Sequence, residues 1–540
     1  MQSTMMQMPL TINQILERGN QIFGDREIIS RRPNKSLHRT KYAELYRRSR
    51  QLAAALVEAG IRPGDRVATL MWNHAFHLEA YFGIPAAGAV LHTLNLRLSP
   101  DDIAYIVNDA QDRALIVDDV LVPVLEKFMP MVKLERIIVV PTSGAPVPEN
   151  YDNYERFIDR DASDYCYPEL EETAACGMCY TSGTTGRPKG VVYSHRSTVL
   201  HALGVALPDC LNLSVMDTVL AVTPMFHANS WGIPYAAVMV GASQVYPGQH
   251  MGAIDLLELM ESEQVTLAMG VPTVWLSIQQ ALEGEPIRWK LKKGMRMMIG
   301  GSAAPPAMIA TFEKHDLAVK HGWGMTELSP VGTLSWLKPE HRGLLPEEQH
   351  RIRALQGLPL PLVELRIIGD YGLMPWDGHS IGELQARGPW VTGGYYNAPT
   401  DPEKFTADGW LRTGDVACID PQGYMRISDR TKDLIKSGGE WISSVDIENA
   451  IMSHPAVAEA AVIGVKHPKW DERPLAAVVV KQGKSVSEQE LRRHLEVHFA
   501  KWQIPDDWAF IEGIPRTSTG KFLKTKLRED FKSWVSRTPS

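Results

Sequence analysis

Tyr180-Thr-Ser-Gly-Thr-Thr-Gly-Arg-Pro-Lys-Gly190 is the stretch that says most about how this chain folds. It follows an apolar run and contains three glycines, four Ser or Thr hydroxyls and a lysine. Backbone N–H groups, hydroxyls and one cation together suit a polyphosphate. The stretch is not a Walker A loop, because Pro188 precedes Lys189 and Gly190 follows it. We expect a phosphate-binding loop between a strand and a helix; a surface loop without a ligand seldom has this composition.

The composition of the whole chain limits the kinds of protein that it can be. Its 540 residues include 56 Lys and Arg and 63 Asp and Glu, which gives a formal net charge of −7. This balance argues against a nucleic-acid partner. Hydrophobic residues make up 44% and charged residues 22%, and no apolar run approaches the roughly 18 residues of a membrane span. We expect a folded protein of three or four structural units, not an integral membrane protein.

The cysteines and the first residues point to a compartment. Cys166, Cys176, Cys179, Cys210 and Cys418 are odd in number, so we expect free thiols in a reducing environment. The one C-x-x-C lies in an apolar run and is interpreted as buried strand rather than as half of a metal site. The first ten residues have no cationic start and no continuous apolar run, so we expect a cytoplasmic protein.

Strand and helix patterns alternate over the first 280 residues, and the order continues to a strand at 297–299. Strands are predicted at 67–71, 115–117, 137–140, 219–222, 265–269 and 297–299, with a helix at 77–87. Another helix is predicted after Ser99, an N-cap candidate followed by Pro100. Apolar strands between helices are typical of parallel sheets covered on both faces.

The pattern changes near residue 357. Short alternating runs at 363–368 and 382–386, with turns such as Asp377-Gly378, predict a small antiparallel barrel or sheet. A helix from Val445, strands at 460–465 and 475–480, and a helix opened by a capping box, Ser487 to Glu490, predict a separate α+β unit.

Further motifs follow the loop in a fixed order. They are Met225-Phe-His-Ala-Asn-Ser-Trp231, Gly300-Gly-Ser-Ala-Ala-Pro305, Gly322-Trp-Gly-Met-Thr-Glu327, Thr413-Gly-Asp415, Asp429-Arg-Thr-Lys-Asp-Leu-Ile-Lys-Ser-Gly-Gly-Glu440 and Pro515-Arg-Thr-Ser-Thr-Gly-Lys521. The loop and these motifs together resemble those of the AMP-forming adenylating enzymes: acyl-CoA synthetases, peptide-synthetase adenylation domains and firefly-type luciferases. The likeness covers the whole chain. It is strongest to bacterial medium- and long-chain fatty acyl-CoA synthetases and related methylmercaptopropionate-CoA ligases.

The resemblance implies a fold and a reaction. The fold is α/β, with a large N-terminal domain of two doubly wound sheets plus a small β-barrel, and a small mobile α+β C-terminal domain. It divides the chain into residues 1–431 and 432–540, with a hinge at Lys432. The reaction converts a carboxylic acid, ATP and CoA into acyl-CoA, AMP and pyrophosphate through an acyl-adenylate. Mg²⁺ is the implied metal, and medium-chain fatty acids are the expected substrates.

Residue by residue, the resemblance implies the nucleotide site. Thr184 and Glu327 would hold Mg²⁺, since a hydroxyl and a carboxylate are the hard oxygen ligands it prefers. Thr181, Ser182, Gly183, Thr185 and Lys189 would bind phosphates. Gly301, Ser302, Ala303, Gly322, Trp323, Gly324, Met325 and Thr326 would surround the adenine and the α-phosphate. Asp415 would accept hydrogen bonds from the ribose hydroxyls, assisted by Arg430. Lys432 would be the last of the nucleotide-binding residues.

The remaining assignments concern catalysis, the acid and CoA. Lys521 would neutralise charge as the carboxylate attacks the α-phosphate. Lys436, which lies on the loop after the hinge, would be a further catalytic residue. Gly438, Gly439 and Glu440 would line the pantetheine path. His227 would lie near the carboxylate, with Trp231, Gly300 and Trp441 at the acyl site. The His227 segment contains no Asp to pair with an ammonium, which disfavours amino-acid substrates.

Other functions stay open at the level of sequence. Two alternatives concern the substrate, which would be 3-methylmercaptopropionate or a long-chain fatty acid. In a third alternative, a carrier protein accepts the acyl group in place of CoA. Two hypotheses propose a different class of function: a non-catalytic nucleotide-binding protein and an oxygen-using luciferase. A homodimer through the large domain is expected because the resembling enzymes are often dimers.

Overall fold

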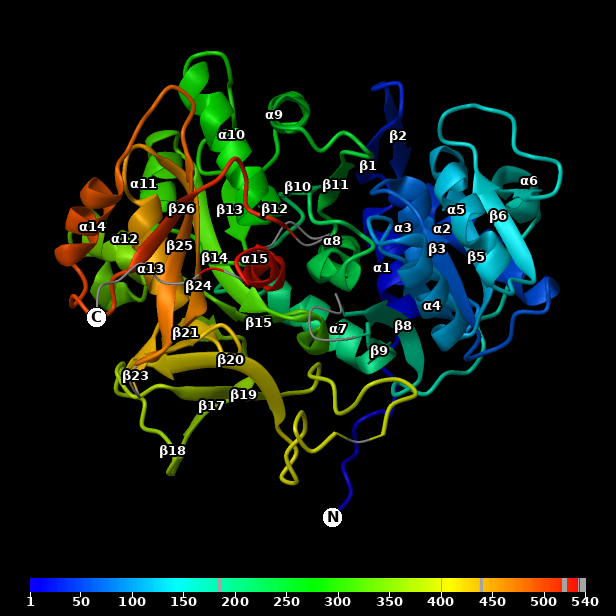
Figure 1. The fold of residues 1–540 in the computed structure, drawn as a ribbon. Coiled ribbons are helices and arrows are strands. Elements are labelled where there is room, and N and C mark those ends of the chain that lie inside the picture. Colours follow the sequence, from blue (N-terminus) through cyan, green and yellow to red (C-terminus); the bar gives the residue numbers. More distant parts are fainter. Residues whose placement is uncertain (182–186, 400, 438–439, 517–521, 533, 535–540) are drawn as a thin grey trace.

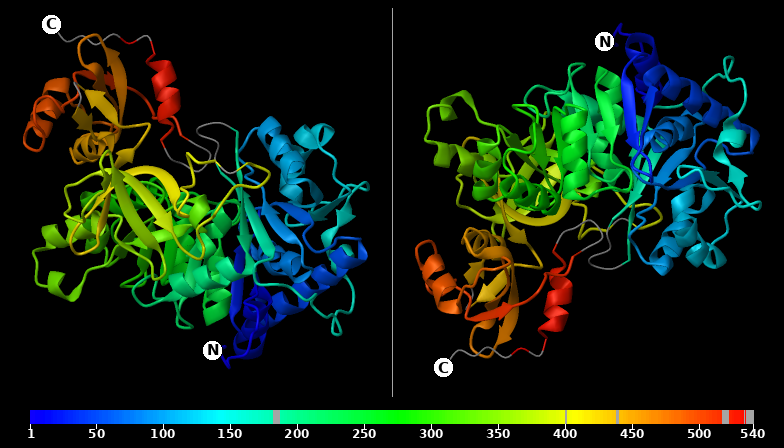
Figure 2. Two further views of the ribbon diagram at one scale, coloured as in Figure 1. Left: turned by 90° about the horizontal axis from the view of Figure 1, so that it is seen from below. Right: turned by 90° about the horizontal axis from the view of Figure 1, so that it is seen from above.

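The computed structural model describes residues 1–181, 187–399, 401–437, 440–516, 522–532 and 534. Within these residues the strands form four sheets, shown in Figure 1. The blue-to-cyan N-terminal part and the green central part each contain a large sheet with helices around it. In both views of Figure 2 the orange-to-red C-terminal part lies to one side of the yellow and green part and away from the blue part.

The first sheet carries the start of the phosphate loop. Its strand order is β7-β6-β5-β3-β4-β8-β9, and every neighbouring pair is parallel except β8 with β9. The strands are β3 (Arg66–Leu70), β4 (Val90–Thr93), β5 (Asp112–Asp118), β6 (Arg136–Val140), β7 (Asp152–Asn153), β8 (Ala175–Tyr180) and β9 (Gly190–Ser194). The antiparallel β8–β9 pair therefore places both ends of the loop at one edge of the sheet.

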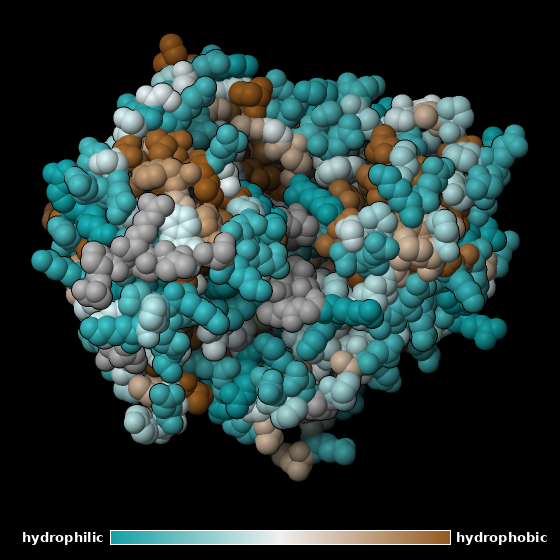
Figure 3. Space-filling view, in the orientation of Figure 1, coloured by the Kyte–Doolittle hydropathy of each residue, from teal (hydrophilic) through white to brown (hydrophobic). Residues whose placement is uncertain are grey.

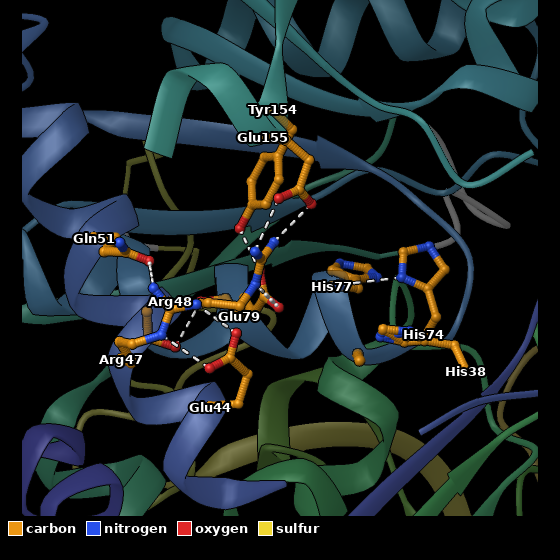
Figure 4. A network of polar contacts seen from close by, with 12 residues as sticks. His38, Glu44, Arg47, Arg48, Gln51, His74, His77, Glu79, Tyr154 and Glu155 are labelled. Carbon is orange, nitrogen blue, oxygen red and sulfur yellow. Dashed lines mark hydrogen bonds and ion pairs between the residues drawn. The ribbon is translucent and has the colours of Figure 1, made fainter. Parts of the chain in front are cut away.

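Helices of the N-terminal part pack on this sheet and on each other. They are α1 (Ile12–Phe23), α2 (Tyr42–Glu58), α3 (Ala75–Ala86), α4 (Pro100–Ala110), α5 (Val122–Phe128) and α6 (Tyr154–Ile158), with the 3₁₀ turns η1 (Asp119–Leu121) and η2 (Met129–Met131). Figure 4 shows how Arg48 ties three of them together: it donates to Glu79 of α3 at 2.7 Å and to both oxygens of Glu155 of α6 at 2.9 Å. Tyr154 donates to the second oxygen of Glu79 at 2.8 Å. Glu79 is buried and Glu155 is exposed, and Arg48 pairs with both carboxylates, so we interpret the cluster as structural.

The second sheet is nine-stranded, with order β16-β15-β14-β13-β12-β10-β11-β1-β2. Its strands are β1 (Glu27–Arg31), β2 (Leu37–Lys41), β10 (Thr218–Ala221), β11 (Ser243–Tyr246), β12 (Leu267–Gly270), β13 (Arg296–Ile299), β14 (Ala318–Gly324), β15 (Val331–Leu334) and β16 (Leu358–Pro359). From β14 to β1 the neighbours are parallel. Its helices and 3₁₀ turns are α7 (His195–Ala206), η3 (Ala228–Gly232), α8 (Ile233–Val240), α9 (Ala253–Ser262), α10 (Pro272–Gly284), α11 (Pro306–Lys314), η4 (Thr326–Leu328), η5 (Pro339–His341) and α12 (Pro346–Ala354).

The last two sheets are smaller and mainly antiparallel. One has the order β18-β17-β19-β20-β21, formed by β17 (Glu364–Gly369), β18 (Gly372–Leu373), β19 (Gly382–Arg387), β20 (Leu411–Ile419) and β21 (Met425–Arg430). The other contains β22 (Ile435–Ser437), β23 (Glu440–Ile442), β24 (Val457–His467), β25 (Asp471–Val480) and β26 (Asp507–Phe510), with helices α13 (Ser444–Met452), α14 (Glu488–Glu496) and α15 (Lys524–Asp530). The chain passes between these two sheets over the four residues from Thr431 to Leu434.

Most predicted element types are confirmed, but the phosphate loop lies between strands β8 and β9 and not between a strand and a helix. Helix α7 begins only at His195, after β9 has paired with β8. The Ser99 hydroxyl accepts the N–H of Asp102 at the start of α4, and the Ser487–Glu490 capping box opens α14. Helix α3 begins two residues earlier than predicted because the His74 imidazole accepts the N–H of His77 and caps it. Strand β12 begins two residues later than predicted because the Val265 N–H bonds to the Met260 carbonyl at the end of α9.

Burial follows the expected pattern. The C-x-x-C cysteines are buried in β8, and all five cysteines are free thiols. The face in Figure 3 is mostly hydrophilic, with scattered hydrophobic side chains. Among the helices of the described residues, none combines the length and apolar character that a bilayer crossing requires.

Candidate active site

The ends of the phosphate loop are joined to each other. Thr181 follows β8 and Lys189 precedes β9, and the Thr181 N–H donates to the Lys189 carbonyl at 3.0 Å. The Thr181 hydroxyl accepts the Lys189 N–H at 3.1 Å. These two bonds close the loop at its base. Ser182, Gly183, Thr184 and Thr185 lie outside the described residues, so their roles stay predictions.

The segments predicted to surround adenine follow neighbouring strands. Gly300, Gly301, Ser302 and Ala303 come directly after β13, and Gly322, Trp323 and Gly324 end the adjacent β14. Parallel strands end at the same edge of a sheet, so the two segments lie together. Gly324 cannot be replaced by a larger residue, because a Cβ there would lie 2.0 Å from the Pro330 carbonyl oxygen.

Glu327, the predicted metal ligand, lies in η4 after Met325 and Thr326 and is 7% exposed. Its carboxylate accepts the Tyr395 hydroxyl at 2.7 Å, and its backbone carbonyl accepts the Thr392 N–H at 2.8 Å. The Thr326 carbonyl accepts the Tyr193 hydroxyl at 2.8 Å. The turn that carries Glu327 is therefore held from both sides.

Asp415, the predicted ribose acceptor, is held by an indole. Trp323 Nε1 donates to its Oδ2 at 2.8 Å, and Arg430 Nε lies 3.5 Å from its Oδ1. The Asp415 N–H donates to the Thr413 hydroxyl at 3.1 Å, which fixes the turn. Trp323 and Asp415 are both 7% exposed. The motif predicted to bind adenine and the motif predicted to bind ribose are thus joined by one hydrogen bond.

The predicted acyl side contains an unusual backbone turn. Ala228, Asn229, Ser230 and Trp231 all have positive φ, between +43° and +56°, and Gly232 follows at +77°. Side chains compensate: Asn229 accepts the Cys179 thiol at 3.3 Å, and Ser230 donates to the Thr223 carbonyl at 2.8 Å. Strain of this kind persists only where the surroundings impose it, and it is frequent at ligand sites.

This left-handed turn brings Trp231 to the end of β13. A Cβ on Gly300 would lie 3.0 and 3.2 Å from two atoms of the Trp231 ring, so the indole lies against that glycine. Trp231 is 6% exposed, and His227 lies just before the turn. The structure therefore brings Trp231 and Gly300 into contact, and their assignment to the acyl site stays a prediction.

Residues at the end of β21 and just after it connect to the C-terminal helices. Asp433 pairs with Arg528 of α15 at 2.6 Å, and Asp429 accepts the Ser444 N–H of α13 at 2.7 Å. Lys524 Nζ lies 2.7 Å from Glu448 Oε1, and burial raises the pKa of Glu448 to about 7. Partial burial, with Arg430 beside it, lowers the pKa of Lys432.

Two residues with other assignments, Lys436 of the catalytic set and Trp441 of the acyl site, lie in the C-terminal sheet. Lys436 and Trp441 face each other in the β22–β23 pair, with Lys436 Nζ 5.7 Å from the centroid of the Trp441 ring. Trp441 therefore lies on β23 of the C-terminal sheet, whereas Trp231 lies in η3 and Gly300 directly follows β13 of the nine-stranded sheet. Gly438, Gly439, the Glu440 side chain and Lys521 lie outside what the structure describes.

Comparison with known proteins identifies the family. Residues 16–396 match the family model of the AMP-binding enzymes, and residues 446–521 match the AMP-binding enzyme C-terminal domain. A long-chain-fatty-acid–CoA ligase of Thermus thermophilus is 51% identical over 98% of this chain and 97% of its own. The chain belongs to the AMP-forming acyl-CoA synthetases.

Other similar ligases differ in the acid that their names give. A medium-chain-fatty-acid–CoA ligase of Ectopseudomonas oleovorans is 43% identical over 99% of this synthetase and 98% of its own length. A 3-methylmercaptopropionyl-CoA ligase of Ruegeria pomeroyi is 43% identical over 98% of both chains. Among solved structures, an anthranilate CoA ligase bound to anthranoyl-AMP superposes with a TM-score of 0.85 at 26% identity, covering 97% and 98% of the two chains. The expected fold class is confirmed.

Sequence reasoning missed Tyr395. The signal was present as Gly393-Gly-Tyr-Tyr-Asn397, a pair of aromatic residues after two glycines in a turn region. Nothing in the stretch itself shows which distant residues its side chains reach. Only the fold brings Tyr395 against Glu327.

Proposed function

We propose that this synthetase activates fatty acids of medium to long chain as CoA thioesters. The observation that carries the proposal is the Trp231 indole against Gly300, an apolar contact beside the segment predicted to bind the adenylate. The 225–231 segment offers no carboxylate for an ammonium group. The names of the 51% and 43% identical ligases support a fatty acid of either length.

A second candidate substrate is 3-methylmercaptopropionate. It is favoured by the 43% identical ligases of two Ruegeria species that carry this name. The acid is short, and its thioether is apolar enough to lie against an indole. The two candidates differ in the length of apolar chain beyond Trp231.

In the proposed mechanism the protein supplies charge and alignment. A carboxylate is already ionised at pH 7, so its attack on the α-phosphate needs no general base. Negative charge grows on the phosphate oxygens as pyrophosphate leaves, and cations must lie close to them. We assign Lys189 and the loop hydroxyls to the outer phosphates, Lys521 to the carboxylate and α-phosphate, and His227 to the carboxylate. Asp415 and Arg430 hold the ribose.

The residues present fit Mg²⁺ as the metal. In the described part of the chain no group of three or more His, Cys, Asp or Glu side chains is arranged to hold a metal alone. Mg²⁺ commonly binds through one or two carboxylates together with substrate phosphates. Glu327, with one oxygen held by Tyr395, supplies such a carboxylate, and Thr184 would add a hydroxyl. Bound there, the metal would neutralise charge on the phosphates.

We propose that residues 432–540 rotate about Lys432 between the two half-reactions. The short passage from β21 to β22 supports this, since a hinge needs only a few residues between rigid elements. Rotation would withdraw Lys521 and bring Gly438, Gly439, Glu440 and Lys436 to the thiol of CoA.

We also propose a cytoplasmic homodimer. Free, mostly buried thiols are expected in a reducing compartment. Met1, Met5, Met6 and Met8 are exposed, and a partner subunit would cover such apolar side chains. Sedimentation of the purified protein tests the dimer: a single species at the monomer mass would contradict it.

The function is tested by measuring AMP and acyl-CoA with ATP, Mg²⁺ and CoA. The acids are straight chains from acetate to stearate, 3-methylmercaptopropionate and a set of amino acids. AMP and thioester rising together, with a maximum between octanoate and palmitate, is the expected result. A maximum at 3-methylmercaptopropionate would establish the second candidate, and AMP without thioester would indicate a carrier-protein acceptor.

A further inference from the structure

One segment outside the predicted site motifs joins two parts of the nucleotide site. Residues 392–397 lie between β19 and β20, and their backbone reaches both parts. The Thr392 N–H donates to the Glu327 carbonyl, and the Tyr396 N–H donates to the Gly190 carbonyl, both at 2.8 Å. The segment thus touches the turn of the predicted metal ligand and the last residue of the phosphate loop.

Within this segment Tyr395 contacts two functional side chains. Its hydroxyl donates to Glu327 Oε1 at 2.7 Å. Its ring faces Lys189, whose Nζ lies 4.9 Å from the ring centroid. Asp401 Oδ2 lies 3.7 Å from the same Nζ. One tyrosine therefore meets an acid from η4 and a cation from the loop before β9.

The chemistry of these contacts is directional. An ionised carboxylate only accepts hydrogen bonds, so the tyrosine must donate, and the bond fixes one of the two oxygens. Among the described residues no other hydrogen bond to the Glu327 carboxylate is made, which leaves the second oxygen available to a metal. The π face of the ring attracts the ammonium and limits where Lys189 can point.

The surroundings keep Tyr395 in place. Its ring packs edge-on against Phe405, with centroids 5.6 Å apart, and against Cys179, Val191 and Tyr193. Tyr193 in turn donates to the carbonyl of Thr326, the residue before Glu327. The hydroxyl is therefore presented to Glu327 from a packed support.

We infer that Tyr395 is a positioning residue for adenylation, which sets the Glu327 carboxylate for the metal and restrains Lys189 for the phosphates. The inference rests on the proposed function, because it takes Glu327 as the metal ligand. Residues that hold a metal ligand commonly change metal affinity or activity by 10- to 100-fold when they are replaced. A ring that served packing alone would act on stability and on both half-reactions equally.

The test is Tyr395→Phe, which removes the hydroxyl and keeps the ring. In pyrophosphate release with a saturating acid, the Mg²⁺ concentration for half-maximal rate should rise about tenfold. Thioester formation from supplied acyl-adenylate and CoA should stay within about twofold of wild type. The melting temperature should equal that of wild type. An unchanged Mg²⁺ dependence, or equal losses in both half-reactions, would overturn the inference.

Two further variants separate the functions of hydroxyl and ring. Tyr396→Phe removes a hydroxyl from the neighbouring ring, which packs near Met178 and Val192, and should leave the Mg²⁺ dependence unchanged. Tyr395→Leu also removes the contact with Lys189 and should raise the KM for ATP about threefold beyond Tyr395→Phe. Equal KM values for the two Tyr395 variants would remove Lys189 from the proposal.

Glu327→Gln distinguishes failure of this inference from failure of the proposed function. If Glu327→Gln leaves the Mg²⁺ dependence unchanged, Glu327 is not the metal ligand and both claims fall. If it raises the requirement and Tyr395→Phe does not, only the role of Tyr395 falls. If Tyr395 acts through Glu327, adding Tyr395→Phe to Glu327→Gln should raise the Mg²⁺ requirement no further. Fully additive effects would contradict that coupling.

Discussion

At the scale of single residues, the site depends on bonds between motifs that are far apart in sequence. Trp323 and Asp415 are 92 positions apart, yet a 2.8 Å hydrogen bond joins them. Each motif supplies a residue type suited to nucleotide binding, but the orientation of Asp415 is set by the other motif. A buried carboxylate without such a donor would lose both its direction and part of its stabilisation.

Trp323→Phe is therefore expected to raise the KM for ATP about tenfold, since a hydrogen bond to a charged group is lost while an aromatic face remains. The KM is measured by pyrophosphate release at saturating acid. Thioester formation from supplied acyl-adenylate serves as the control and should change less than the adenylation step. An unaltered KM for ATP would show that Asp415 does not depend on the indole.

At the scale of elements, the left-handed turn of η3 decides where Trp231 lies. Gly232 ends this turn at φ +77°, and a Cβ there would lie 2.5 Å from Nδ1 of the buried His201. His201 Nε2 accepts the Val331 N–H at 3.2 Å, so the imidazole cannot move away without losing that bond. The turn is thus fixed by helix α7 on one side and β15 on the other.

Gly232→Ala should lower the free energy of unfolding by about 3 kcal/mol, from the left-handed backbone together with the steric clash. Gly60→Ala is the matched control. Gly60 has φ +89° and open space around it, so its replacement should cost only about 1 kcal/mol. Both values come from chemical denaturation. Equal costs for the two variants would mean that the contact with His201 is unimportant.

The passage between β21 and β22 allows a second prediction at this scale. Lys432→Pro should suppress thioester formation and spare acyl-adenylate formation, because a fixed φ restricts the proposed rotation. Lys521→Ala should do the reverse. The two half-reactions are followed separately, as pyrophosphate release and as CoA thioester formed from supplied acyl-adenylate. Loss of the same half-reaction in both variants would contradict the assigned hinge.

At the scale of the whole molecule, buried histidines link stability to pH. Burial lowers the pKa of His77 and His201 to about 3 and that of His195 to about 4. In the unfolded chain these side chains bind protons near pH 6.5, whereas the folded protein keeps them neutral. Their contribution to stability is therefore complete above pH 6.5 and decreases as the pH falls toward 4.

His195→Asn tests this linkage. An asparagine oxygen can replace His195 Nδ1, which accepts the Ile12 N–H at 3.3 Å, without titrating. The melting temperature of the variant should fall less steeply than that of wild type between pH 6.5 and 4.5. Parallel curves for the two proteins would show that His195 does not contribute to the acid sensitivity.

Element types and the order of the motifs were predictable from sequence because both depend on local residue patterns. Apolar runs, the Ser99 cap and the Ser487–Glu490 capping box act over a few residues, and the structure confirms them. The residues at which helices and strands begin were less predictable. Helix α3 begins early because of a side-chain cap by His74, and β12 begins late because Val265 still bonds to α9.

The sequence by itself therefore determined the α/β class, the family and the residue types of a nucleotide site. Only the tertiary structure decided that Trp323 orients Asp415, that Trp231 lies against Gly300, and that Tyr395 links Glu327 with Lys189. The physical reason is range. Propensity, capping and loop composition act between near neighbours in the chain, whereas these contacts join strands, turns and loops that are far apart in sequence.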